Sequence, residues 1–197
     1  MERTLPDHLA ARLPEVRAKH AALGLTDDES ETTIWSIFRA EDIRGEDTFA
    51  DVEWLEVIFG GRLAELGRLQ FEDSGDGVLD VHIPETGPLT PAVCDASFAR
   101  AREVFPNHHT FACTSWLLDP ALADALPEDS NIVRFQRRFT LTDEGDDGNA
   151  DVLRFVFHTT DPDLDKLEPA TTLTRALVAR IRAGEQWRVP RGVLSLA

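Results

Sequence analysis

His82 and Asp80 are the first pair of side chains in this sequence that could carry out acid–base chemistry. They alternate with Leu79, Val81 and Ile83, so a strand would place both on one face, about 6–7 Å apart. A neutral imidazole can accept a proton from an amine, and a carboxylate beside it stabilises the charge that results. We expect His82 to be a general base assisted by Asp80. The alternative is a histidine held by hydrogen bonds beside a surface carboxylate.

Cys113 and Ser115 share one face of a second predicted strand, 111–118. A thiol or hydroxyl near a histidine could act as a nucleophile, provided that a base lies next to it. A cysteine in a mainly apolar strand is more often an inert core residue. We therefore expect Ser115 to serve as a hydrogen-bond donor to the substrate.

Arg134 and Arg138 alternate with Gln136 in a segment, 131–141, that we predict to be a strand. Two guanidinium groups in a row can hold an anionic ligand. The alternative is a solvated sheet face that balances acidic neighbours. His, Cys, Asp and Glu do not recur at the spacing of a three- or four-ligand metal site, so we expect no metal.

The composition limits the classes of function. The chain has 197 residues, with 36 acidic and 20 basic side chains and a formal net charge of −16. This length suits one domain with a small extension. The negative charge argues against nucleic acid or an anionic membrane as partner. No apolar run could span a bilayer, the start of the chain lacks the apolar core of a signal peptide, and there are only two cysteines, so we expect a cytoplasmic protein with reduced thiols.

The elements that position these residues follow from hydrophobic periodicity. Apolar residues recur at helical spacing in the first part of the chain, and the period changes to two from Gly67 onward. Thr90 and Pro91 form a typical helix start. We predict helices at 4–23, 49–66, 90–105 and 172–183, a short helix after Asp119, and strands at 69–72, 78–84, 111–118, 131–141, 151–158 and 187–196. This order indicates an α+β or α/β fold with a mixed sheet.

Several blocks of sequence resemble a family of bacterial acyltransferase-domain proteins. These blocks are GRLQFE (67–72), HIPETGPLTP (82–91), CTSWLLDPALADALPEDSNIVRFQRRF (113–139) and the late TTLTRALVARIRAG. The C-terminal half of that family is GNAT-like, after the Gcn5-related N-acyltransferases. The resemblance covers 51–197 and leaves 1–50 as a short helical N-terminal extension. It implies an α+β fold with a mixed, mostly antiparallel sheet flanked by helices.

The resemblance also implies a function. A GNAT-like protein transfers an acyl group from a CoA or carrier thioester to an amine, here of a small molecule or peptide. Acyl-CoA would be the co-substrate, with its pyrophosphate near Gly87 and Thr90 and its phosphates near Arg134 and Arg138. Ser115 would orient the thioester, and His82 would deprotonate the amine. The arginines of the basic C-terminal segment would help to offset the acidic body.

Two departures from the family pattern support an alternative. The sequence has no tyrosine, the residue with which many GNAT enzymes protonate the leaving thiolate, and Pro88 and Pro91 remove backbone donors from the phosphate loop. The alternative is a non-catalytic binding or assembly module in which apolar residues of the first part of the chain face a partner, such as a second copy: Trp35, Phe38, Trp54 and Phe59. The enzyme interpretation requires an open gap between the strands at His82 and Ser115.

Overall fold

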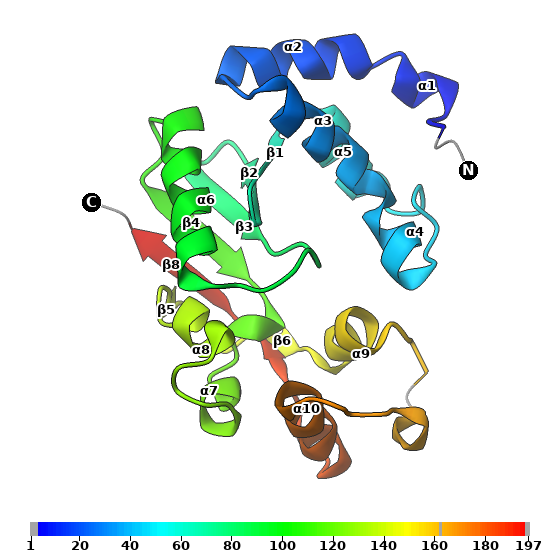
Figure 1. Ribbon diagram of the computed structural model, residues 1–197, viewed down its shortest axis with the longest axis vertical. Coiled ribbons are helices and arrows are strands. Elements are labelled where there is room, and N and C mark those ends of the chain that lie inside the picture. The colour runs from blue at the N-terminus through cyan, green and yellow to red at the C-terminus, as the bar shows by residue number, and fades with distance from the viewer. Residues whose placement is uncertain (1–3, 162, 196–197) are drawn as a thin grey trace.

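The computed structural model describes residues 4–161 and 163–195 (Figure 1). Its α-helices are α1 (Asp7–Ala10), α2 (Leu13–Leu23), α3 (Asp27–Trp35), α4 (Arg39–Arg44), α5 (Val52–Phe59), α6 (Pro91–Val104), α7 (Ala121–Ala125), α8 (Asn131–Gln136), α9 (Asn149–Phe157) and α10 (Thr172–Arg182). Short 3-10 turns occupy Ser36–Phe38, Trp116–Leu118 and Leu164–Lys166. The strands are β1 (Leu63–Leu66), β2 (Leu69–Asp73), β3 (Val78–His82), β4 (Thr110–Thr114), β5 (Thr140–Leu141), β6 (Asp146–Asp147), β7 (Arg188–Val189) and β8 (Arg191–Ser195).

One sheet organises the molecule. Its strand order is β1-β2-β3-β4-β8-β5, and a separate pair joins β6 to β7. Strands β3 and β4 run parallel, whereas every other neighbouring pair is antiparallel. Helix α6 covers one face, helices α1–α5 lie toward one end, and α7–α10 lie toward the other (Figure 1). The expected α+β fold with a mixed, mostly antiparallel sheet is therefore confirmed.

The core forms where the period-two strands meet the helical stripe of α6. Phe71, Phe98 and Phe111 come from β2, α6 and β4, and their ring centroids lie 5.1–5.8 Å apart in edge-to-face contacts. All three rings are buried, and such pairs add to the free energy gained by burial alone. This cluster fixes α6 against the strands that carry the predicted site residues.

The N-terminal helices share a second apolar cluster with α5 and β1. Val16, Ile34, Phe59 and Leu63 are among its buried members. Because the cluster includes residues on both sides of position 50, the predicted boundary between 1–50 and 51–197 coincides with no break in packing. The boundary itself stays a prediction.

The aromatic residues proposed to face a partner lie in the same N-terminal region. Phe38 and Phe59 are buried, and Trp35 and Trp54 are half-buried and pack against the cluster. These side chains are thus packed, wholly or in part, against their own chain, and a homodimer stays a prediction.

Two of the predicted strands are helices instead. The segment 131–141 begins with α8, because Ser130 accepts a hydrogen bond from the amide of Val133 and caps the helix. The segment 151–158 lies almost entirely in α9, which buries Val152 and Leu153 on one face. Short apolar runs rich in Val and Phe fit strand and helix patterns equally well, and the tertiary packing decides.

The predicted helix 49–66 was also wrong in its second half. Helix α5 stops at Phe59, and Gly61 takes a left-handed conformation with φ of 69°. A Cβ at Gly61 would lie 2.8 Å from the Lys19 side chain, so both this contact and the positive φ favour glycine at the turn. After the turn the chain continues as strand β1.

We expect Phe111→Ala to destabilise the protein by about 3–5 kcal/mol, because its ring is fully buried between Phe71 and Phe98. Urea denaturation followed by circular dichroism measures the change. The control is Val52→Ala, at a side chain that is 64% exposed, which should change stability by less than about 0.5 kcal/mol. A loss below about 1 kcal/mol for Phe111→Ala would contradict the packing described here.

Candidate active site

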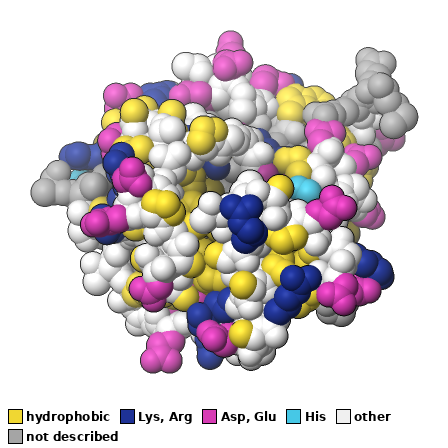
Figure 2. Space-filling model, turned by 60° about the horizontal axis from the view of Figure 1, so that its bottom comes forward, with side chains coloured by type: hydrophobic (Ala, Val, Ile, Leu, Met, Phe, Trp, Pro, Cys, Tyr) yellow, Lys and Arg dark blue, Asp and Glu magenta, His cyan; other side chains and the backbone are white. Residues whose placement is uncertain are grey.

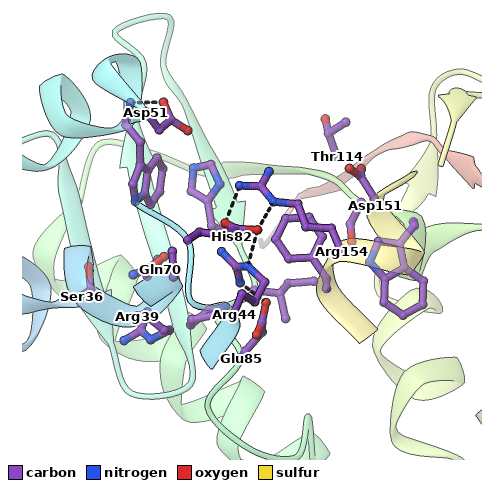
Figure 3. Close-up of a pocket in the computed structure, with 18 of the residues that line it drawn as sticks. Ser36, Arg39, Arg44, Asp51, Gln70, His82, Glu85, Thr114, Asp151 and Arg154 are labelled. Carbon is purple, nitrogen blue, oxygen red and sulfur yellow. Dashed lines mark hydrogen bonds and ion pairs between the residues drawn. The ribbon is translucent and has the colours of Figure 1, made fainter. Parts of the chain in front are cut away.

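A cavity of about 630 Å³ lies beside the end of strands β3 and β4. Its walls come from α4 and the loop to α5, from the ends of the two strands with the segments that follow them, and from α9 (Figure 3). This volume is within the range of small-molecule and cofactor sites.

The opening exists because β3 and β4 stop pairing before they end. Their parallel register runs through Val78, Leu79 and Asp80 opposite Thr110, Phe111 and Ala112. Beyond that point, His82 on β3 and Ser115 after β4 line the cavity from its two strand walls. The gap that the enzyme interpretation requires is therefore present in the fold.

His82 is held in place by two contacts. Its Nε2 lies 3.0 Å from Oε2 of Glu72, and its ring meets Trp54 edge to face with centroids 4.9 Å apart. The hydrogen bond from His82 lowers the pKa of Glu72 against the opposing effect of burial. A carboxylate at Nε2 accepts the proton of that nitrogen, so Nδ1 is the nitrogen able to take a further proton.

Asp80 occupies a different network from the one expected. Its carboxylate accepts a hydrogen bond from Ser74 and forms an ion pair with Arg191 at 2.9 Å. Glu72, which sequence reasoning missed, is the acid that contacts His82. The antiparallel register explains the exchange, because Gln70 lies directly opposite His82 and Glu72 is the next residue of β2 on the same face.

Ser115 and Cys113 differ sharply in chemical state. The Ser115 Oγ accepts a hydrogen bond from the amide of Leu117 at 3.1 Å, which leaves its hydroxyl hydrogen available to donate. Burial, with a smaller contribution from the nearby Asp80 carboxylate, raises the pKa of the Cys113 thiol to about 12. Cys113 is therefore a protonated core residue, as expected from its strand.

The loop between β3 and α6 is held by arginine. Arg68 donates to the carbonyls of Pro84 and Gly87 at 2.7 and 3.0 Å, and Gly87 has a φ of 109°. Thr90 is the N-cap residue of α6, although its side chain makes no capping hydrogen bond. Gly87 and Thr90 thus lie at the helix start where the resemblance places an anion.

Arg138 and Arg134 do not form the expected row. Arg138 pairs with Asp95 in the first turns of α6 at 2.6 Å and donates to the Pro91 carbonyl. Arg134 lies exposed on helix α8. The strand prediction for 131–141 failed, and with it the shared face. Arg68, which the sequence analysis did not single out, lines the cavity and lies with Arg138 near the start of α6.

A charged network joins two distant segments at the cavity (Figure 3). Arg154 of α9 binds both carboxylate oxygens of Glu46 at 2.8 Å, and Arg44 pairs with Glu46 and Glu85. The hydrogen bond from Arg154 lowers the pKa of Glu46 to about 2. The Phe155 ring lies 5.0 and 5.2 Å from the guanidinium carbons of Arg44 and Arg154. These contacts close the side of the cavity between α4 and α9.

The arginines of α10 have hydrogen-bond or ion-pair partners within the chain. Arg180 pairs with Glu185 at 2.8 Å, and Arg182 donates to the Leu164 carbonyl. Figure 2 shows acidic and basic side chains interspersed over the lower end of the molecule, with apolar side chains between them. An anion-binding role for the arginines of α10 therefore stays a prediction.

Residues 4–161 and 163–195 contain neither a cluster of metal-binding side chains nor a membrane-spanning helix. Within these ranges, His, Cys, Asp and Glu side chains do not gather in groups of three or more that could bind a metal. No helix in them has both the length and the hydropathy needed to cross a membrane.

We expect Cys113 and Cys94 of the native protein to react with iodoacetamide at pH 8 at least about a hundredfold more slowly than the same thiols in urea. Burial raises the pKa of both thiols, and the thiolate is the reactive form. Mass spectrometry of time-resolved labelling measures the rates. Labelling of native Cys113 at the rate of an exposed thiol would show that it is accessible and ionised.

Comparison with solved structures identifies crystal structures of acyltransferases. A mutant acyltransferase in complex with octanoyl-CoA is 32% identical, with a TM-score of 0.83, over 96% of this chain and 65% of that one. An acyltransferase in complex with decanoyl-CoA and teicoplanin is 33% identical, with a TM-score of 0.82, over 96% and 65%. A complex with decanoyl-CoA is 35% identical, with a TM-score of 0.83, over 96% and 64%. The chain thus spans about 65% of the length of these structures. No curated protein matches it.

A family model matches the part of the chain that forms the sheet and helices α6 to α10. The match covers residues 63–194, from the start of β1 to the residue before the end of β8, and its family is described as the GNAT-like C-terminal domain. This confirms the resemblance seen in the sequence. The chain belongs to the family of proteins that carry a GNAT-like C-terminal domain.

Proposed function

We propose that this protein is an acyl-CoA-dependent N-acyltransferase that moves an acyl group from a CoA thioester to a primary amine. The observation that supports it most strongly is the gap between the ends of β3 and β4, lined by His82 on one wall and Ser115 on the other. The structural neighbours are acyltransferases crystallised with octanoyl-CoA or decanoyl-CoA, which fits a thioester in this gap.

The proposed reaction begins with the amine in the cavity beside His82. Nδ1 of His82 takes a proton as the amine nitrogen attacks the thioester carbon, which forms a tetrahedral intermediate. The Ser115 hydroxyl donates a hydrogen bond to the oxygen that becomes negative. Collapse of the intermediate breaks the carbon–sulfur bond, and the imidazolium returns the proton to the CoA thiolate. Glu72 stabilises the imidazolium between these two proton transfers.

CoA is strongly anionic, so its binding to an acidic protein requires local positive charge. Arg68 and Arg138 supply it at the start of α6, where the helix dipole also favours an anion. Gly87 and Thr90 would lie against the pyrophosphate. We place Arg134 outside the site, because it is exposed on α8.

The proposal also covers the acceptor, the extent of the transferase domain and the cellular compartment. The acceptor is an amine of a small molecule, in line with the neighbour that was crystallised with teicoplanin. We assign the transferase to 51–197 together with the cavity wall supplied by the preceding helices. We also place the protein in the cytoplasm, where its two buried free thiols, Cys94 and Cys113, would stay reduced.

We expect His82→Gln to lower kcat/KM for acyl transfer to a primary amine by about 100- to 10,000-fold, the contribution of a general base. Release of CoA from octanoyl-CoA, detected with a thiol reagent, measures the rate. Octanoyl-CoA should still bind, and calorimetry checks this. Asp80→Asn is the matched control on the same strand face, and it should cost much less because Asp80 pairs with Arg191.

Two results would contradict this assignment. Equal losses for His82→Gln and Asp80→Asn would mean that the strand face matters only for folding. Failure of the unmodified protein to bind any acyl-CoA at millimolar concentration would reject the enzyme altogether.

We expect Arg68→Ala to weaken octanoyl-CoA binding about tenfold or more, because a charge-assisted hydrogen bond contributes about 1.5–3 kcal/mol. Octanoyl-pantetheine lacks the phosphates, so its affinity should change less than about twofold. Arg102→Ala, on the exposed side of the far end of α6, is the control and should alter neither affinity. Equal weakening of both ligands would mean that Arg68 only supports the loop from Pro84 to Gly87.

A non-catalytic module is the second candidate. It is favoured by the loop itself, since Pro88 and Pro91 lack amide hydrogens and Glu85 adds a carboxylate that Arg44 neutralises. Octanoyl-CoA binding without transfer to any amine would support it. Light scattering would then show whether the chain forms a homodimer.

A further inference from the structure

Asp151 is a carboxylate in the cavity wall without a partner. It lies in the first turn of α9 and lines the cavity across from His82 (Figure 3). It is half-buried, yet within residues 4–161 and 163–195 its side chain makes no hydrogen bond or ion pair. Burial raises its pKa, and Arg154 opposes this only through a longer-range attraction. A partly desolvated carboxylate is costly to leave unpaired.

The other charged side chains of the cavity are already engaged. Arg154 directs its donors to Glu46, and Arg39 binds both oxygens of Glu65. The remaining ones have partners as well: Arg44 with Glu85, Arg68 with two carbonyls, Asp47 with the Phe49 amide and Asp51 with the Trp54 amide. Among the described charged residues that line the cavity, Asp151 is thus the one whose side chain has neither a hydrogen bond nor an ion pair.

The charges of the cavity also divide by position. Arg68 contacts the loop before α6, where the anionic part of CoA would bind, whereas Asp151 lies in the first turn of α9. Asp47 and Asp51, which are exposed, line the cavity through the loop between α4 and α5. A net charge of −16 further raises the local concentration of cations.

We propose that Asp151 binds a positively charged group of the acceptor, so that the preferred acceptor is a small molecule with at least two amino groups. One amine attacks the thioester beside His82, and the second, as an ammonium, pairs with Asp151 across the cavity. This inference rests on the proposed acyl transfer and adds the class of acceptor to it. Figure 3 shows His82 on the β3 side of the cavity and Asp151 on the α9 side, so we assign a separate amine to each.

The test compares three acceptors of equal chain length: hexamethylenediamine, aminohexanol and hexylamine, each with octanoyl-CoA. The unmodified protein should use the diamine with a kcat/KM about tenfold above that of the other two. Asp151→Asn should remove this preference through a higher KM for the diamine, with little change in kcat. Turnover of hexylamine, unchanged within about twofold, shows that the variant is folded. Asp124→Asn on the exposed surface of α7 is the charge-matched control.

A binding measurement separates this inference from the proposed function. Calorimetric titration of hexamethylenediamine into the protein saturated with CoA should show affinity about tenfold weaker for Asp151→Asn, even if no acyl transfer is detected. Unchanged diamine binding would overturn the role of Asp151. Equal loss of activity with all three acceptors would also overturn it, since Asp151 would then act on the reaction or the fold rather than on a second amine.

Discussion

The divergence of β3 and β4 is the constraint on which the site depends. Two parallel strands that paired to their ends would fill this space with backbone hydrogen bonds, and His82 and Ser115 would face no common cavity. Where the strands diverge, the backbone groups of β3 and β4 no longer hydrogen-bond to each other. The separated strand ends therefore need rigid support from both sides. The aromatic cluster of Phe71, Phe98 and Phe111 gives that support to the strand segments just before the gap.

The proposed reaction adds an electrostatic requirement, because an acidic chain would have to accept both an anion and a cation. In our proposal, different residues of the cavity serve the two ligands. Arg68 donates to a carbonyl of the loop before α6 and Arg138 donates to the Pro91 carbonyl, so both lie near the N-terminus of this helix, where its dipole adds to their charge. The opposite wall carries Asp151 and receives the general negative field of the molecule. The net charge of −16 would therefore attract the proposed amine, while these arginines would offset it locally for acyl-CoA.

The sequence predicted those elements and site residues that depend on local hydrophobic periodicity and helix-start signals. Alternation predicted β2 and β3, the Thr90-Pro91 start predicted α6, and both strand-borne site residues proved to line one cavity. The errors arose where long-range packing decides. The apolar runs of α8 and α9 fit either secondary structure, so Arg138 was placed on a strand and Asp151 was overlooked. Glu72 could have been found only from the register of the β2–β3 hairpin.

The residues before the family match complete the site. Trp54 packs on His82, and Glu46 joins the N-terminal part to Arg154 of α9, about a hundred positions further along the chain. The segment 63–194 alone would leave one wall of the cavity open and the imidazole exposed on that side. Because an exposed imidazole rotates more freely and meets more water, these contacts confine His82 to one orientation. The geometry of the proposed site in this chain therefore depends on packing between its first helices and its GNAT-like domain.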